Sequence, residues 1–268
     1  MTPAIDPNRI VDSVPDGLGV IDPGRLRLLN LVFGLAHLLQ AVVFIVLSED
    51  VDLDVTAMFA SGPPGSPVDP GALEVLFSYP LGPAIALFSL LSAFFHLLIV
   101  SPWGWPRYLA ELSGGQNRFR WVEYSLSASL MIVLIAGITG ISDVAALVAL
   151  FGVNASMILF GWLMETTNDP GRGADWSPFV FGCIAGVVPW IAIGVYLFGA
   201  GEEVPNFVYG IFVSIFVLFN CFAVNQLLQY LGTGRWADYL FGERIYVWLS
   251  LTAKSLLAWQ VFANVLVG

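Results

Sequence analysis

Long apolar runs separated by short polar segments follow one another along almost the whole chain. Seven of the runs have about 20 residues, the length that a helix needs to cross a hydrocarbon core of about 30 Å. Lipid offers no partners for unpaired backbone groups, so an open chain crosses it only as helix. The pattern predicts an all-α membrane protein in which residues 1–268 form a single seven-helix bundle. The expected spans are Leu26–Leu47, Leu81–Ser101, Phe119–Gly140, Asp143–Met164, Pro178–Phe198, Phe207–Leu231 and Tyr239–Val267.

The composition fits a protein whose solvent is lipid. Hydrophobic residues make up 57% of the chain and charged residues 11%, far from the usual composition of soluble domains. The first 24 residues are polar and mostly acidic, and the apolar run after them is too long for a signal peptide, so we expect it to remain as an anchor. The net charge of −10 argues against nucleic-acid binding. Cys183 and Cys221 lie in apolar runs without metal-ligand spacing and are expected to be buried, inert thiols.

The arginines all fall on one side of the predicted bundle. The nine are Arg9, Arg25, Arg27, Arg107, Arg118, Arg120, Arg172, Arg235 and Arg244. The opposite side has acidic residues and no basic one, namely Glu49, Asp50, Asp52, Asp54, Asp69, Glu74, Glu202 and Glu203. By the positive-inside rule, the N-terminal segment 1–24 is expected in the cytoplasm and the C-terminus outside, with the protein in the plasma membrane.

The one long connection, residues 48–80, falls on the acidic, extracellular side. Its "VDLDV" alternates apolar and acidic residues with a period of two, "SGPPGSPVDPG" is dense in turn formers, and "LEVLF" can supply a second strand. We expect a small β-hairpin in this loop. An irregular acidic loop is the alternative.

Few ionisable residues lie inside the spans, and each is a functional candidate because a charge in lipid is costly. They are Lys254, which is the single lysine of the chain, Glu123, His37 and His96. A rise of about 1.5 Å per residue places all four in the middle or the cytoplasmic half of the bundle. A helical side chain leans toward the N-terminus of its helix, which directs Lys254 toward Glu123. Asp143 is expected to be a helix N-cap, whereas Glu165 could be plain surface or the mouth of a polar cavity.

A lysine at this depth favours one kind of chemistry. Desolvation disfavours its charged form, and a neutral amine in an apolar pocket is the nucleophile that forms a Schiff base with an aldehyde. The protonated product is a buried cation, for which Glu123 is the carboxylate available inside the spans. A plain ion pair between Lys254 and Glu123 is the alternative, although desolvating such a pair often costs more than the pairing returns.

A pocket for a long apolar aldehyde should be lined by aromatic and small side chains. The candidates on the neighbouring spans are Ser127, Met131, Asn154, Met157, Gly161, Trp190, Phe212, Phe216, Phe219, Phe222 and Trp259. Each of them alone could equally be ordinary packing. The spans offer no nucleophile beside a base and no cluster of metal ligands, so neither an enzyme nor a metal site is expected.

Seven spans with a lysine in the seventh and a carboxylate in the third resemble the microbial rhodopsins. The segments "RWVEYSLSASLM", "FFHLL" and "SLTAKSLLAWQ", together with the expected cytoplasmic N-terminus, resemble one branch of them, the heliorhodopsins. The resemblance covers all seven spans and implies that all-trans retinal is bound to Lys254 as a protonated Schiff base, with Glu123 as counterion. It also implies a short β-sheet in the first outer loop.

The resemblance implies further roles near the chromophore. Ser250 stands where ion-pumping rhodopsins keep a second carboxylate, and Phe219 and Gln226 stand where pumps usually carry tryptophans. The residues that match the family's proton-accepting polar network on the cytoplasmic side are His37, His96, Gln40 and Ser92.

The spans lack the parts of a proton pump. Leu134, eleven residues after Glu123 on the same helix face, occupies the place where pumps commonly have a proton-donating carboxylate. We expect light to move a proton to the polar network and back without net transport, as in a sensor with an unidentified cytoplasmic signalling partner. A light-driven or light-gated ion transporter is the alternative. A small-molecule receptor or transporter is disfavoured by the arginine pattern and by the lack of paired broken helices.

Gly182 and Gly186 form a G-x-x-x-G spacing, which permits close helix approach. Because heliorhodopsins are dimeric, the resemblance implies a homodimer through the fourth and fifth spans, with membrane lipid around the rest of the bundle. Packing of the two glycines within one subunit is the alternative.

Overall fold

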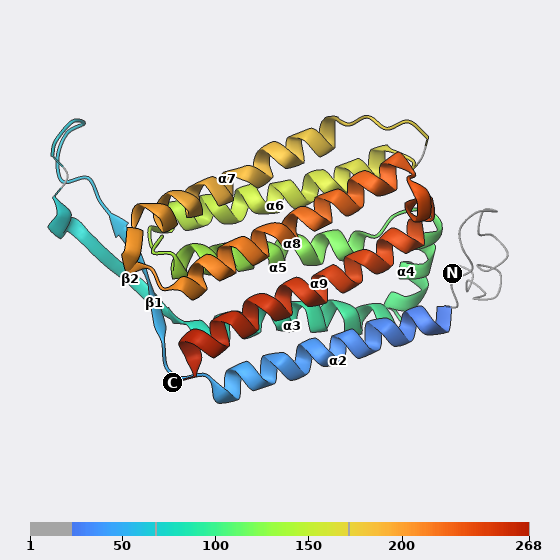
Figure 1. Cartoon of the computed structure of the whole chain (residues 1–268), viewed down its shortest axis with the longest axis horizontal. Helices are drawn as coiled ribbons and strands as arrows, with labels where there is room; N and C mark the ends of the chain where they lie inside the picture. Colours follow the sequence, from blue (N-terminus) through green and yellow to red (C-terminus); the bar gives the residue numbers. More distant parts are fainter. Residues whose placement is uncertain (1–22, 68, 171, 268) are drawn as a thin grey trace.

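The computed structural model describes residues 23–67, 69–170 and 172–267. Long helices run side by side along the molecule, and a β-hairpin projects from one end of the bundle (Figure 1). Within the described ranges, seven helices are long and apolar enough to cross a membrane, which confirms the predicted all-α bundle. Residues 1–22 of the predicted N-terminal segment, which include Arg9, lie outside the described residues.

The membrane helices lie close to the predicted spans. They are α2 (Pro23–Leu47), α3 (Leu81–Val100), α5 (Arg118–Ile138), α6 (Val144–Thr167), α7 (Ser177–Gly199), α8 (Asn206–Leu231) and α9 (Tyr239–Val261). A short π-helix, η4 (Phe262–Leu266), extends α9, and a 3-10 turn, η2 (Gly201–Glu203), joins α7 to α8. The prediction missed mainly the ends, because polar residues at the membrane border continue a helix without adding to its apolar signal.

Side-chain caps set several of the helix boundaries. Asp143 accepts a hydrogen bond from the backbone N–H of Ala146, which confirms it as the N-cap of α6, and Asp238 caps α9 in the same way. A carboxylate at this position satisfies an otherwise unpaired donor and meets the positive end of the helix dipole. Before α7, the backbone N–H and hydroxyl of Ser177 donate to Asp175 and lower the pKa of that exposed carboxyl.

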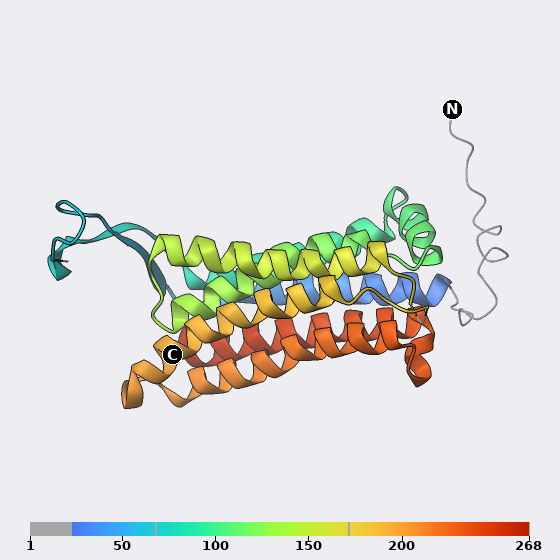
Figure 2. The same ribbon diagram turned by 90° about the horizontal axis from the view of Figure 1, so that it is seen from above.

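The two ends of the bundle differ in charge. At one end lie the short helix α4 (Gly104–Ser113), which was not predicted, and the 3-10 turn η3 (Gly234–Ala237) (Figures 1 and 2). The described arginines gather there, so we call it the arginine end; they are Arg25, Arg27, Arg107, Arg118, Arg120, Arg172, Arg235 and Arg244. The opposite end carries the β-hairpin and is called the hairpin end.

The hairpin consists of β1 (Asp52–Met58) and β2 (Leu73–Pro80), with a 3-10 turn, η1 (Pro70–Ala72), before β2. The strands pair antiparallel, the first residue of β1 opposite the last of β2, with a bulge after Val55. This confirms the predicted hairpin in the loop 48–80. The next residue, Thr56, fastens it to the bundle, since its N–H donates to the carbonyl of Ser142 at 2.8 Å and the two hydroxyl oxygens are 2.9 Å apart.

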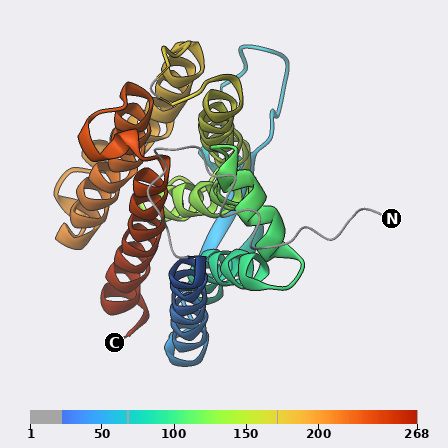
Figure 3. The same ribbon diagram turned by 90° about the vertical axis from the view of Figure 1, so that its right-hand side faces the viewer.

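Two helices are enclosed by the others. In the view from the arginine end, α5 lies between its neighbours rather than on the rim (Figure 3). Over their most apolar stretches, 56% of α5 and 50% of α9 is buried, against 17% of α8. Charged or polar groups on α5 and α9 can therefore be kept away from lipid.

The cysteines lie toward the outside of the bundle. Cys183 on α7 is exposed and Cys221 on α8 is half-buried, both as free thiols. The prediction that they are buried was wrong. An apolar side chain on a membrane helix needs no burial in protein, because the surrounding lipid is itself apolar.

Candidate functional site

The amine of Lys254 lies at the centre of the bundle among three oxygen atoms. Its Nζ is 2.6 Å from Glu123 Oε1 on α5, 2.6 Å from Ser92 Oγ on α3 and 3.0 Å from Ser250 Oγ, one turn earlier on α9. Ser92 Oγ also donates to Glu123 Oε1 at 2.8 Å. The structure thus brings together a lysine and a glutamate that are 131 positions apart in the chain.

This pair is almost completely out of contact with solvent. The side chain of Lys254 is 4% exposed and that of Glu123 is 7% exposed. Buried charges are tolerated when they are paired and their remaining hydrogen-bonding positions are filled. Here two serine hydroxyls supply those bonds, and the face of Tyr124 lies 5.1 Å from the amine. The arrangement places a buried primary amine beside a carboxylate that can balance a positive charge on its nitrogen.

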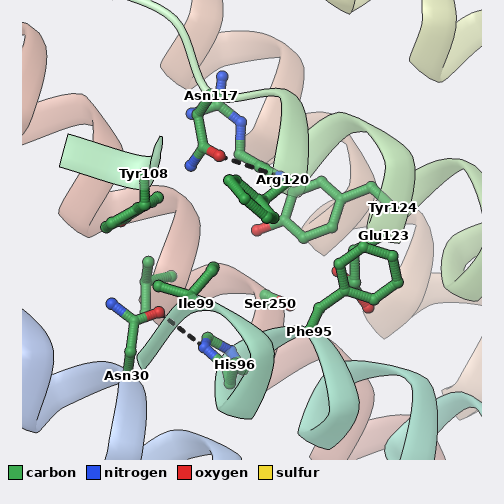
Figure 4. Close-up of a pocket in the computed structure, with 12 residues that line it drawn as sticks. Asn30, Phe95, His96, Ile99, Tyr108, Asn117, Arg120, Glu123, Tyr124 and Ser250 are labelled. Carbon is green, nitrogen blue, oxygen red and sulfur yellow. Dashed lines mark hydrogen bonds between the residues drawn. The ribbon is translucent and has the colours of Figure 1, made fainter. Parts of the chain in front are cut away.

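A polar cavity of about 30 Å³ extends from Glu123 toward the arginine end (Figure 4). Its wall includes His96, whose Nδ1 is 2.9 Å from Asn30 Oδ1. His37 stacks on His96 with ring centroids 5.9 Å apart, is fully buried, and has neither ring nitrogen bonded to any described protein group. A cavity of this size accommodates an ordered water molecule beside His96 and Glu123.

Gln40, the remaining predicted member of the polar network, lies farther toward the hairpin end. Its Nε2 donates to Ser255 Oγ at 2.8 Å, linking α2 to α9 beside Lys254. The predicted network residues are therefore neighbours of the amine, although Gln40 does not line the polar cavity.

On the other side of Lys254 the surroundings are apolar. A hollow of about 50 Å³ touches the lysine and is lined by Ser127, Met131 and Met157. A second hollow of about 220 Å³ shares the walls Met157, Phe219 and Phe222 with the first. We call the two together the apolar hollow. It extends from the amine toward α7, where Trp190 stands in a cluster of phenylalanines.

Two glycines make room for the apolar hollow. A Cβ added to Gly161 would lie 2.5 Å from the ring of Trp121, and a Cβ added to Gly186 would lie 2.6 Å from Met157 Sδ. Both distances are shorter than non-bonded carbon contacts allow. Glycine at these two positions therefore lets Trp121 and Met157, which line the hollow, pack directly against the helix backbone.

Most of the predicted pocket residues line the apolar hollow, and three do not. Asn154 donates to Ser129 Oγ at 3.1 Å between α6 and α5. Phe212 packs edge-on against Trp190, with ring centroids 5.6 Å apart. Trp259 is 43% exposed and packs on the buried rings of Phe44 and Phe262. These three residues support the site from outside or belong to general packing.

Gln226 closes the hollow on the side of the arginine end. Its Nε2 donates to the backbone carbonyl of Gly161 at 2.9 Å, linking α8 to α6. The side chain is buried and lines the larger hollow. A glutamine that satisfies a helix carbonyl in this way can form part of the wall without leaving polar groups unpaired.

The structure also shows a buried ionic cluster that sequence reasoning missed. Arg120 pairs with Glu165 (Nη2 to Oε1, 2.7 Å) and with Glu243, and all three side chains are at most 4% exposed. The sequence placed Arg120 only among the arginines on the expected cytoplasmic side. The positions of these residues in the sequence could have indicated the cluster. Arg120 precedes Glu123 by three residues and Glu243 precedes Lys254 by eleven, so each lies on the same helix face as a site residue.

Comparison with known proteins agrees with this geometry. The family model for heliorhodopsin matches residues 26–266. Among solved structures, a light-driven proton pump, LR (Mac), from Leptosphaeria maculans is similar over 91% of this chain and 95% of its own, with a TM-score of 0.60 and 14% identity, which supports the fold alone. No curated protein sequence matches. The chain is therefore a multi-pass membrane protein that belongs to the heliorhodopsin family, a group of rhodopsins for which a retinal chromophore is implied.

Proposed function

We propose that this heliorhodopsin is a light sensor that binds all-trans retinal as a Schiff base on Lys254, with Glu123 as the counterion. The observation that carries the proposal is the 2.6 Å contact between Lys254 Nζ and Glu123 Oε1 at the mouth of the apolar hollow. An aldehyde that reaches the amine through the hollow leaves its apolar chain among aromatic and small side chains.

Polar residues of the site act on the charge of the Lys254 nitrogen, and apolar residues enclose the chromophore. Bound retinal supplies the visible absorption and a double bond that light isomerises. Glu123 balances the positive charge on the Lys254 nitrogen, while Ser92 and Ser250 orient that nitrogen through their hydroxyls. Met157 and Trp190 confine the apolar part and exclude water from it.

Proton movement is expected toward the arginine end only. His96 and the unpaired imidazole of His37 offer places for a proton near Glu123. Within the described residues, every buried acidic or basic side chain lies at the level of Lys254 or between it and the arginine end. Leu134, buried toward the hairpin end, offers no proton-binding group. A proton can then leave the nitrogen and return without crossing the membrane.

The charge asymmetry supports an orientation with the arginine end in the cytoplasm. Under this proposal α4 and the short turns at that end face an unidentified signalling partner inside the cell. The heliorhodopsin family is generally one of light-absorbing receptors rather than classical enzymes. A signalling role also fits the described part of the chain, in which no buried acidic or basic side chain lies between Lys254 and the hairpin end.

We also propose a homodimer through α6 and α7, as the resemblance to the heliorhodopsins implies; exposed side chains such as Val148 and Val195 would lie in the contact. Gly182 and Gly186 do not serve it, since added Cβ atoms would meet Phe160 and Met157 of the same chain. Cross-linking in membranes, compared between the wild type and Val195→Lys, tests the contact, and an unchanged dimer in that variant would argue against it.

Colour tests the sensor proposal. Adding retinal to the expressed protein should produce a visible band that hydroxylamine bleaches, and Lys254→Ala should remain colourless. Ser250→Ala is the matched control, because it alters the same pocket and keeps the amine. A light-pulse pH measurement on cells separates sensor from transporter: a light-driven pH change that a protonophore abolishes would favour the transporter.

A further inference from the structure

We propose that Trp121 passes the light signal from the apolar hollow to the buried Glu165 cluster, so that the turn between α4 and α5 is the segment that responds to light. This inference rests on the proposed function. It names the route by which an event at the chromophore would reach the arginine end of the bundle.

The first step is the position of the Trp121 ring. The indole is 5% exposed and lines the apolar hollow next to Gly161. The ring packs directly against the backbone of Gly161, so closely that a Cβ on that residue would lie 2.5 Å from it. On another side it meets the ring of Tyr246 edge to face, with ring centroids 6.1 Å apart. Because packed interiors transmit displacement rather than absorb it, a change of shape in the hollow must move this ring or its neighbours.

The second step is the bond from the indole to Glu165. Trp121 Nε1 donates to Glu165 Oε2, on the side of the ring away from the hollow. The same oxygen accepts from the backbone N–H of Asn117 at 2.9 Å, and the other carboxylate oxygen accepts from Arg120 and from Tyr239. One carboxylate therefore ties the hollow to groups from α5, α9 and the turn before α5.

The third step is the turn itself, residues 114–117. Asn117 is 3% exposed and caps α5 by accepting from the Arg120 N–H at 3.1 Å, while its Nδ2 donates to Glu243 Oε2 at 2.9 Å. The next residue, Arg118, bonds to Glu111 of α4 through its backbone N–H and its guanidinium, both at 2.8 Å. The turn is thus bonded to Glu165 and Glu243 through Asn117, and the adjoining Arg118 is bonded to α4.

Hydrogen bonds to a buried carboxylate are strong and directional, so moving one donor changes how well the others are satisfied. If Trp121 shifts, Glu165 must follow it or lose the indole bond. Either response alters the acceptor that holds the Asn117 N–H. The nearest backbone groups outside the helices are those of the turn, which makes it the part of this network that opens at the lowest cost.

Hydrogen exchange with and without illumination tests the inference on the retinal-reconstituted full chain in nanodiscs. In the wild type, peptides covering residues 112–121 should exchange on the order of tenfold faster in the light, the change expected for loosening one bond to a charged group. Trp121→Phe keeps a ring in the hollow and removes the donor, so the light effect should disappear. Trp162→Phe is the matched control, because it removes an indole next to Gly161 on α6 that does not line the hollow and whose Nε1 has no partner among the described residues, and it should retain the effect.

The outcomes separate the two proposals. A protein without a hydroxylamine-sensitive band refutes the sensor function itself. A coloured wild type with no light effect at the turn, or a Trp121→Phe variant that keeps the effect, overturns only the route. Should Trp121→Phe fail to fold, Glu165→Gln serves instead: its turn should exchange faster already in the dark and gain nothing in the light, and a persisting light effect would contradict the route.

Discussion

The substitution Gly161→Ala probes the shape of the apolar hollow with a single methyl group. Its Cβ would lie 2.5 Å and 2.8 Å from two atoms of the Trp121 ring. Because Trp121 is itself packed against Tyr246 and bonded to Glu165, the ring has little freedom to move away. We expect an overpacking cost of about 1–3 kcal/mol, reduced by the gain of about 1 kcal/mol that alanine brings over glycine within a helix.

The matched control lies on the same helix. A Cβ at Gly152 would meet no atom within 4 Å, so Gly152→Ala receives the helix gain and no overpacking cost. The two variants should therefore differ in stability by about 1–3 kcal/mol, and each kcal/mol corresponds to a shift of about 2–4 °C in the unfolding midpoint for a chain of this size.

The assay is thermal unfolding of the two purified variants, followed by retinal titration. Gly161→Ala should melt at least about 2 °C below Gly152→Ala and should yield less pigment, because a displaced Trp121 narrows the hollow. Equal midpoints and equal pigment yields would refute the claim that Gly161 is there to admit the Trp121 ring.

Three further predictions concern the polar side of the site. Glu123→Gln leaves the Lys254 cation without its partner and should lower the free energy of unfolding of the retinal-free protein by about 3–5 kcal/mol. Denaturant unfolding measures this free energy. A variant as stable as the wild type would be inconsistent with a buried ion pair. Ser92→Ala removes one bond to each partner and should cost about 1–3 kcal/mol, less than Glu123→Gln in the same assay; a larger loss would contradict the ranking. Burial raises the pKa of Tyr108 on α4 to about 12. In an absorbance titration against Tyr108→Phe, this phenol should ionise after the exposed tyrosines near pH 10, and its contribution to stability should be lost as the pH rises from about 10 to 12; ionisation near pH 10 would show that it is not buried.

The sequence predicted the parts of this protein that depend on periodicity and on the cost of charge in lipid. The seven spans follow from their length, and the hairpin follows from the alternation in "VDLDV". Lys254 and Glu123 were singled out because a lone cation and a lone carboxylate inside apolar helices require a reason. The structure adds that the two side chains meet, with Ser92 between them.

The parts that escaped prediction depend on tertiary contacts. Arg120 and Glu243 stand near helix ends, where a charged residue needs no special explanation, and only the packing of α5, α6 and α9 buries them together with Glu165. The helix α4 escaped because its ten residues of mixed polarity are too few and too polar to cross a membrane, and the prediction rested on apolar runs long enough to do so. Trp259 was predicted to line the pocket as an aromatic residue on the span of Lys254, yet its side chain is 43% exposed.

The most direct test of the central claim is to trap the link between retinal and the chain. The reconstituted protein is treated with borohydride, digested and mapped by mass spectrometry. The account predicts a retinyl group on the peptide that contains Lys254, formed in proportion to the visible band and missing from Lys254→Ala. A coloured protein whose Lys254 peptide stays unmodified after reduction would contradict it.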